Sequence, residues 1–155
     1  MRTGRRLAID VGKVRIGLAI SDLHGILASG LTNVSRAKTL ELTCEAIQLA
    51  IADEDLLEIY VGLPLSMSGG HSASTADAIE VARALAERTS IPIRMIDERL
   101  STVSATTSLR ASGRDSKSGR KVIDQIAATI ILEQAMAIEK QTGEVAGLSL
   151  EDLND

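Results

Sequence analysis

Three carboxylates occupy positions that suggest chemistry rather than packing, and Asp10 is the first of them. Asp10 lies between Ile9 and Val11 in a run that otherwise has the pattern of a buried strand. A buried carboxylate is unfavourable unless a partner compensates its charge. A metal ion would do so, and so would structural hydrogen bonds at the turn that Gly12 predicts. The residue types alone leave both interpretations open.

Glu98 and Asp124 are the other two candidates. Glu98 directly follows the strand-like run 91–97, and α/β sheets commonly place ligands and catalytic groups at the carboxyl ends of their strands. It could equally belong to an exposed charge cluster with Asp97 and Arg99. Asp124 opens the last predicted helix, with small residues three and four positions later that allow close packing on a sheet. A helix-start acid stabilised by the helix dipole is the alternative explanation.

Carboxylate oxygens at the ends of elements favour a hard cation, Mg²⁺ or Mn²⁺. Two histidines and one cysteine in the whole chain are too few for a zinc site. Two such ions about 4 Å apart can activate a water and stabilise the leaving oxygen in phosphodiester cleavage. The predicted chemistry is therefore metal-assisted hydrolysis, for which no protein nucleophile is required.

Basic residues are gathered in two runs although the chain carries a formal net charge of −4. Residues 1–15 and residues 110–121 each contain five basic side chains against one acidic side chain. Either run could be a solvated face or a surface that meets phosphates. With one Tyr and no Phe or Trp, aromatic stacking is excluded as the main mode of nucleic-acid binding. The candidate nucleic-acid contacts are Lys13, Arg15, Arg99, Arg110, Arg114, Lys117, Arg120 and Lys121.

Several other classes of protein are disfavoured by the sequence. The loop 66–72 lacks the ending of a phosphate-binding P-loop, and no dinucleotide fingerprint follows the first strand. The single Cys44 fits a buried, inert thiol in a reducing cytoplasm. No apolar run approaches the about 20 residues that a membrane span needs. We therefore expect a cytoplasmic protein that is not a nucleotide-binding fold.

Hydrophobic periodicity predicts an α/β chain whose elements begin as hairpins and then alternate. The predicted strands cover 6–11, 14–20, about 27–34, 57–63 and 91–97. The predicted helices cover 38–53, 74–88, Ser101 to about 111 and 122–141, with a loop at 112–121. This order predicts a mixed five-stranded sheet flanked by helices in one domain, 1–143. The acidic, aperiodic segment 144–155 is expected to be a flexible tail.

Four motifs in the same order resemble the YqgF/RuvX family across most of the chain. They are DVGKVRIGLAISD at 10–22, VGLPLSMSG at 61–69, DERLST at 97–102, and Ile123-Asp124 followed by Ala127-Ala128. Members of that family are described as Holliday junction resolvases and as nucleases that mature the 5′ end of pre-16S rRNA. The resemblance implies a ribonuclease H-like fold and a metal-dependent nuclease.

The resemblance also assigns Asp10, Glu98 and Asp124 as catalytic metal ligands, and it selects Glu98 over Asp97. The chain departs from the family at Ser104, where relatives often carry an acid. Resolvases of the superfamily usually use a fourth carboxylate, and no residue here can be assigned to it. A nucleic-acid-binding module of ribosome assembly or transcription, with weak or no catalysis, therefore stays as the alternative function. The implied partners are pre-rRNA or branched DNA, and a homodimer would suit a two-fold junction.

Overall fold

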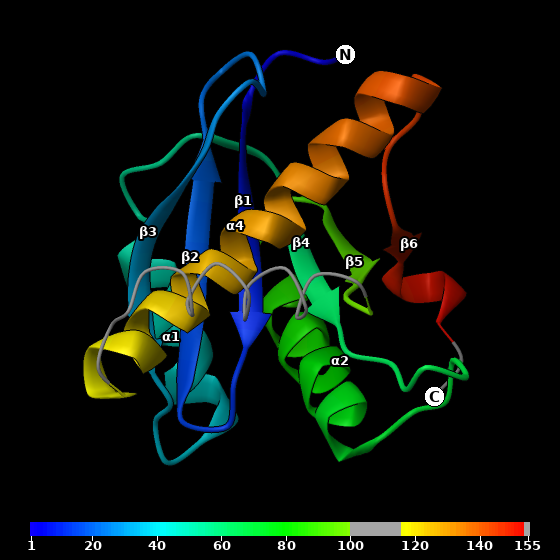
Figure 1. Cartoon of the computed structure of the whole chain (residues 1–155). Coiled ribbons are helices and arrows are strands. Elements are labelled where there is room, and N and C mark those ends of the chain that lie inside the picture. Colours follow the sequence, from blue (N-terminus) through cyan, green and yellow to red (C-terminus); the bar gives the residue numbers. More distant parts are fainter. Residues whose placement is uncertain (100–115, 154–155) are drawn as a thin grey trace.

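Three layers make up the molecule, with one sheet in the middle (Figure 1). The computed structural model describes residues 1–99 and 116–153, and for 116–124 the backbone alone. Helix α4 (Ser116–Thr142) crosses one face of the sheet diagonally, while α1 (Leu40–Ala50) and α2 (Ala73–Ala86) cover the other face. A side chain on the sheet is therefore buried beneath α4 or beneath the helix pair, according to the face it points from.

The sheet is mixed, and its first strand lies near the middle. Its strands are β1 (Arg5–Val11), β2 (Arg15–Ser21), β3 (Ala28–Ser35), β4 (Leu56–Leu63), β5 (Ile93–Asp97) and β6 (Leu148–Ser149). Their order across the sheet is β3-β2-β1-β4-β5-β6. The first three form the predicted antiparallel meander, whereas β1, β4 and β5 are parallel. The carboxyl ends of β1, β4 and β5 consequently meet at one edge of the sheet.

The sheet has six strands rather than the five that the sequence predicts. The extra strand, β6, lies in the segment expected to be a flexible tail and pairs antiparallel with β5. Arg94 on β5 fixes this segment, because its Nε and Nη2 each donate a 2.6 Å hydrogen bond, to the carbonyls of Ala146 and Gly147. A strand of two residues is too short to show a hydrophobic period, so the sequence pattern misses it.

Local capping explains where the first two helices begin. Thr39 accepts a hydrogen bond from the backbone N–H of Leu42 at the start of α1. Ser72 and Thr75 form a reciprocal capping box at the start of α2. Helix α4 begins at 116, so the prediction of a loop through 121 is wrong for its second half. Lysine and arginine are good helix formers, and they outweigh the glycine and serines of that stretch. The helix expected from Ser101 to about 111 lies outside the described residues.

Alternation along β1 sorts the core into two clusters. Leu7 and Ile9 are fully buried on the face that packs against α1 and α2. Ala8 is fully buried on the other face, together with Tyr60 and the small and branched residues of α4. Since side chains alternate along a strand, Asp10 shares the face of Ala8. The α4 face is built from small residues at this point, which lets the helix lie close to the sheet.

No helix within residues 1–99 and 116–153 combines the length and the apolar character that a transmembrane span requires.

Candidate active site

Asp10 is the second-last residue of β1 and is half-buried. It lies opposite Gly17 of β2, and its predecessor Ile9 is paired with Val61 of β4. The next residue of β4 is Gly62, so Asp10 has a glycine near it on both neighbouring strands. The carboxylate therefore lies near the carboxyl ends of β1 and β4, on the face of the sheet that α4 covers.

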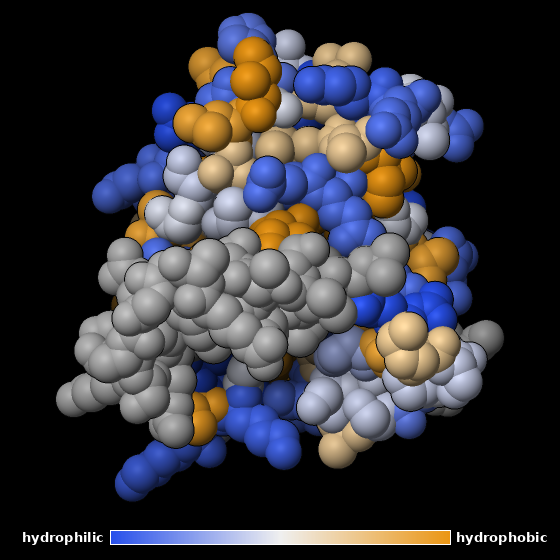
Figure 2. Space-filling model, in the orientation of Figure 1, coloured by the Kyte–Doolittle hydropathy of each residue, from blue (hydrophilic) through white to orange (hydrophobic). Residues whose placement is uncertain are grey.

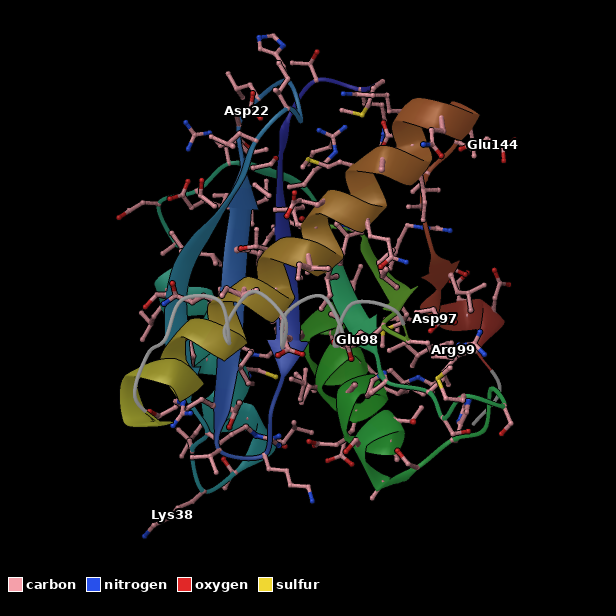
Figure 3. The ribbon with its side chains drawn as sticks, viewed as in Figure 1. Asp22, Lys38, Asp97, Glu98, Arg99 and Glu144 are labelled. Carbon is pink, nitrogen blue, oxygen red and sulfur yellow. The ribbon has the colours of Figure 1, made fainter. Side chains whose placement is uncertain are left out.

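Glu98 reaches the same place from β5. Its backbone N–H donates a 3.1 Å hydrogen bond to the carbonyl of Leu63, which ties the residue after β5 to the end of β4. Its side chain lies over Gly62, because a Cβ at that position would come within 2.6 Å of Glu98 Cδ and 2.7 Å of Oε1. Figure 3 shows Glu98 in front of β4. Only glycine at position 62 leaves room for this carboxylate.

Asp10 and Glu98 are joined by a side-chain hydrogen bond. Burial raises the pKa of Glu98 well above its usual value, and the neighbouring charge of Asp10 and that hydrogen bond raise it further. Two acidic groups in contact repel each other when both are ionised, so one retains a proton or a cation must lie between them. This electrostatic arrangement is typical of functional sites rather than of structural ion pairs.

Asp124 belongs to α4, and its side chain lies outside the described residues. Four residues later Ala128 is fully buried, and so is Ile131, seven residues later. A Cβ on Gly62 would also come within 2.6 Å of Ile131 Cδ1, so α4 passes directly over the place where Glu98 lies. Among the described side chains, no group of three or more metal-ligating residues occurs. The structure thus brings together two of the three predicted ligands.

Asp97 turns away from this pair and binds Arg99. The Nε and Nη2 of Arg99 lie 2.8 Å and 2.5 Å from Asp97 Oδ2, so the two side chains form a two-pronged ion pair. Partial burial acts to raise the pKa of Asp97, but the hydrogen bonds and charge of Arg99 outweigh it and hold that pKa below its usual value. Figure 3 shows the two residues beside Glu98 on the side of β6. Arg99, predicted as a nucleic-acid contact, is thus already engaged within the chain.

The turn between β1 and β2 places two predicted phosphate contacts next to Asp10. Gly12 donates a 3.0 Å hydrogen bond to the carbonyl of Arg15, and a Cβ on Gly12 would collide with that carbonyl oxygen. Lys13 at the tip is exposed, and Arg15 is partly exposed. Glycine at position 12 is therefore required by the turn that carries these cations.

Arg36 holds that turn in place, and the sequence gives no hint of this role. Its Nη1 donates 3.1 Å to the carbonyl of Gly12 and 2.8 Å to Asp77 Oδ2, and its Nη2 donates 3.2 Å to Asp77 Oδ1. The partners lie 24 and 41 residues away along the chain. Only the fold can bring such distant partners together.

The predicted basic run at 1–15 is split by the strand on which it lies. Arg2 and Arg6 are at the opposite end of β1 from Asp10, where both pair with the buried Glu139. Arg5 pairs with Glu54. The run at 1–15 therefore does not form one basic surface, because the strand separates its two ends. Of the other predicted contacts, Arg110 and Arg114 lie outside the described residues, and only the backbone of α4 is described at Lys117, Arg120 and Lys121.

Comparison with known proteins identifies the family to which the chain belongs. The family model of RuvX, described as Holliday junction resolvase, matches residues 4–138. The chain belongs to the RuvX family. A relative from Leifsonia xyli is 49% identical over 97% of both chains, and one from Clavibacter michiganensis is 53% identical over 95% of this chain and 91% of its own. Both carry the name "Putative pre-16S rRNA nuclease".

A solved structure confirms the fold expected for the RuvX family. T. thermophilus RuvC in complex with a Holliday junction substrate superposes with a TM-score of 0.54 and 14% identity, over 93% of this chain and 99% of that one. The fold is thus ribonuclease H-like, as predicted, and the similarity at this identity concerns the fold alone.

Proposed function

We propose that this protein is a divalent-metal-dependent nuclease that hydrolyses phosphodiester bonds in the 5′-end processing of pre-16S rRNA. The contact between the Asp10 and Glu98 carboxylates over Gly62 carries the proposal. The substrate is inferred from the names of the relatives from Leifsonia xyli and Clavibacter michiganensis.

The two carboxylates fit Mg²⁺ or Mn²⁺, because both present hard oxygen donors at one place. Helical spacing supports Asp124 as the third ligand, since it precedes the buried Ala128 and Ile131 by one and two turns. When bound, the metal would activate a water and stabilise the leaving oxygen. Asp10 and Glu98 are held rigidly for that task, one inside a strand and the other fixed to the end of β4.

The remaining residues position the substrate. Lys13 and Arg15 flank the turn after Asp10, so they can neutralise phosphates that lie next to the carboxylates. Arg36 keeps that turn fixed to α2 through Asp77. The basic residues at the start of α4 and before it would contact further phosphates of the bound RNA strand.

A cleavage assay tests the proposal. End-labelled fragments that span the 5′ end of 16S rRNA, and four-way DNA junctions, are incubated with Mn²⁺ or with chelator. We expect metal-dependent cuts in the RNA, their complete loss in Asp10→Asn, and normal activity in Asp53→Asn, an exposed acid outside the site. Binding without cuts would instead identify a module of ribosome assembly or transcription. Cuts confined to the junction would identify a resolvase.

Metal binding is measurable without activity. Titration calorimetry with Mn²⁺ should show a site in the wild type that is lost in Asp10→Asn and kept in Asp53→Asn. Equal Mn²⁺ affinity in all three proteins would reject Asp10 as a ligand, whatever the protein cleaves.

The expected setting and assembly follow from the same function. Cys44 is free and buried, which fits a reducing cytoplasm. Trimming of an RNA end needs one active site, whereas a two-fold junction needs two. Sedimentation of the protein with and without a junction therefore tests the homodimer: a dimer that forms only on the junction would favour resolution over trimming.

A further inference from the structure

We propose that a groove beside the two carboxylates holds one unpaired nucleobase of the strand that is cut. This inference rests on the proposed function and names the part of the substrate that the site recognises. The groove consists of two adjoining hollows of about 340 and 420 Å³, which share Asp97, Arg99 and Gln134. Both volumes fall within the range of about 300–1,000 Å³ typical of ligand pockets.

The lining of the groove matches the chemistry of a base. The apolar side chains that it exposes come from the segment after β4, from α4 and from β6, and are Leu65, Ile138 and Leu148. Leu63, Met95 and Ile96 also border it but are at most 3% exposed. Its polar rim offers a carboxylate, a guanidinium and an amide, from Asp97, Arg99 and Gln134. A nucleobase has an apolar face for the apolar side chains and polar edges for the rim.

Its location selects a nucleic acid as the occupant. Asp97 lines the groove and is followed directly by Glu98, so the groove adjoins the proposed cleavage site (Figure 3). The side-chain amide of Gln134 donates a 3.3 Å hydrogen bond to the backbone carbonyl of Asp97, which links α4 to this rim. A base in the groove would belong to a nucleotide next to the one whose phosphate meets Asp10 and Glu98.

Met67 supplies a surface on which a base can lie. It is 79% exposed and stands at the rim of the groove, on the loop between β4 and α2. The loop is tightly closed, because Ser66 receives hydrogen bonds from Gly69 and Gly70 and donates one back to Gly70. The Met67 side chain is therefore open to contact by a ligand in the groove.

Apart from its two histidines, the chain has one aromatic side chain. This residue, Tyr60, is fully buried. Within the groove, the soft thioether of Met67 and the flat guanidinium of Arg99, which Asp97 holds in one orientation, can contact a base face.

A scan with abasic nucleotides tests the proposal. A single-stranded 12-nucleotide RNA is compared with versions that each lack one base, by fluorescence anisotropy in chelator so that no strand is cut. In the wild type, loss of one particular base should weaken binding about fivefold, and loss of the others should have a smaller effect. Met67→Ala should bind the intact RNA about fivefold more weakly and show no preferred position. Met67→Leu, which keeps the volume, should restore the preference.

The matched control is Leu49→Ala, which removes a similarly exposed apolar side chain, 73% exposed, from α1 on the other face of the sheet. It should leave the scan unchanged. A wild type with no preferred base, or a preference that survives Met67→Ala, would overturn the groove as a base site. The scan measures binding without cleavage. A protein that does not cut RNA can therefore still confirm the groove as a base site, and a protein that is a metal-dependent nuclease can still show no base site there.

Discussion

The two ends of β1 bury charge in opposite ways. At its amino end Glu139, 3% exposed, receives hydrogen bonds from Arg2 and from the fully buried Arg6. Near its carboxyl end Asp10 and Glu98 place two acidic groups against each other. The first arrangement pairs opposite charges, whereas the second places two groups of like charge in contact. The charge of the partner, rather than burial, therefore distinguishes the structural cluster from the candidate site.

Removal of Glu139 from the cluster at the amino end of β1 should have the largest effect on stability. Glu139→Ala leaves the buried Arg6 without its carboxylate, and a broken buried ion pair costs about 3–5 kcal/mol. The free energy of unfolding in urea measures this loss. Glu45→Ala, on the exposed side of α1, is the control and should change stability by less than about 0.5 kcal/mol. Equal losses in the two variants would show that the cluster stabilises nothing.

The second-largest effect is expected at low pH, where the cluster of Arg2, Arg6 and Glu139 should stabilise the fold less. Hydrogen bonds from Arg2 lower the pKa of Glu139 to about 2 although burial acts to raise it. Because the folded-state value lies below the unfolded value of about 4.3, the stabilisation is present above pH 4.3 and is lost as the pH falls toward 2. It amounts to about 3 kcal/mol. The difference in unfolding free energy between wild type and Glu139→Gln should shrink over that range, and a constant difference would contradict the assignment.

At the functional end, Gly62→Ala should push the Glu98 carboxylate out of place. The new methyl group would overlap Glu98 and Ile131, and such overpacking costs about 1–3 kcal/mol. Cleavage should be lost in a protein that still folds, as circular dichroism can verify. Gly70→Ala meets nothing closer than a serine hydroxyl at 3.1 Å and should retain activity. Full cleavage by Gly62→Ala would remove Glu98 from the site.

The smallest effect, and one of opposite sign, is expected from Glu98→Gln in metal-free protein. This variant replaces one of the two acids in contact with a neutral amide that can still hydrogen-bond to Asp10. Substitutions that relieve a strained functional site commonly add about 0.5–2 kcal/mol while activity falls. Thermal unfolding in chelator measures the gain, with Glu45→Gln as control. A clear destabilisation would place Asp10 and Glu98 in a structural role like that of Glu139.

The sequence predicted the elements and their order well where apolar residues repeat several times along an element. Strands β1 to β5 and the helices α1 and α2 repeat apolar residues often enough to be recognised. The start of α4 and the strand β6 were missed. The first six residues of α4 are five polar residues and a glycine, and β6 has only two residues, so neither segment shows an apolar repeat. The mixed sheet was predicted correctly, and its sixth strand was not.

Within the candidate site, the cost of burying a charge pointed to Asp10, and the family resemblance selected Glu98. The structure brings these two side chains into contact, and the roles proposed for Asp10, Glu98, Asp124 and the basic residues remain predictions. Gly62 and Arg36 were not recognised. A glycine required by a side chain 36 positions later, and an arginine whose partners are 24 and 41 positions away, depend on contacts that no local pattern records.

The two-residue strand β6 also protects the sheet from other chains. Without it, β5 would be an outer strand with free backbone N–H and C=O groups, which is the usual starting point for edge-to-edge aggregation and strand exchange. The pairing of Leu148 and Ser149 with β5, fixed by Arg94, covers Arg94 and Met95 on that edge. A few residues that contribute little to the core thus leave less of β5 open to pairing with another chain.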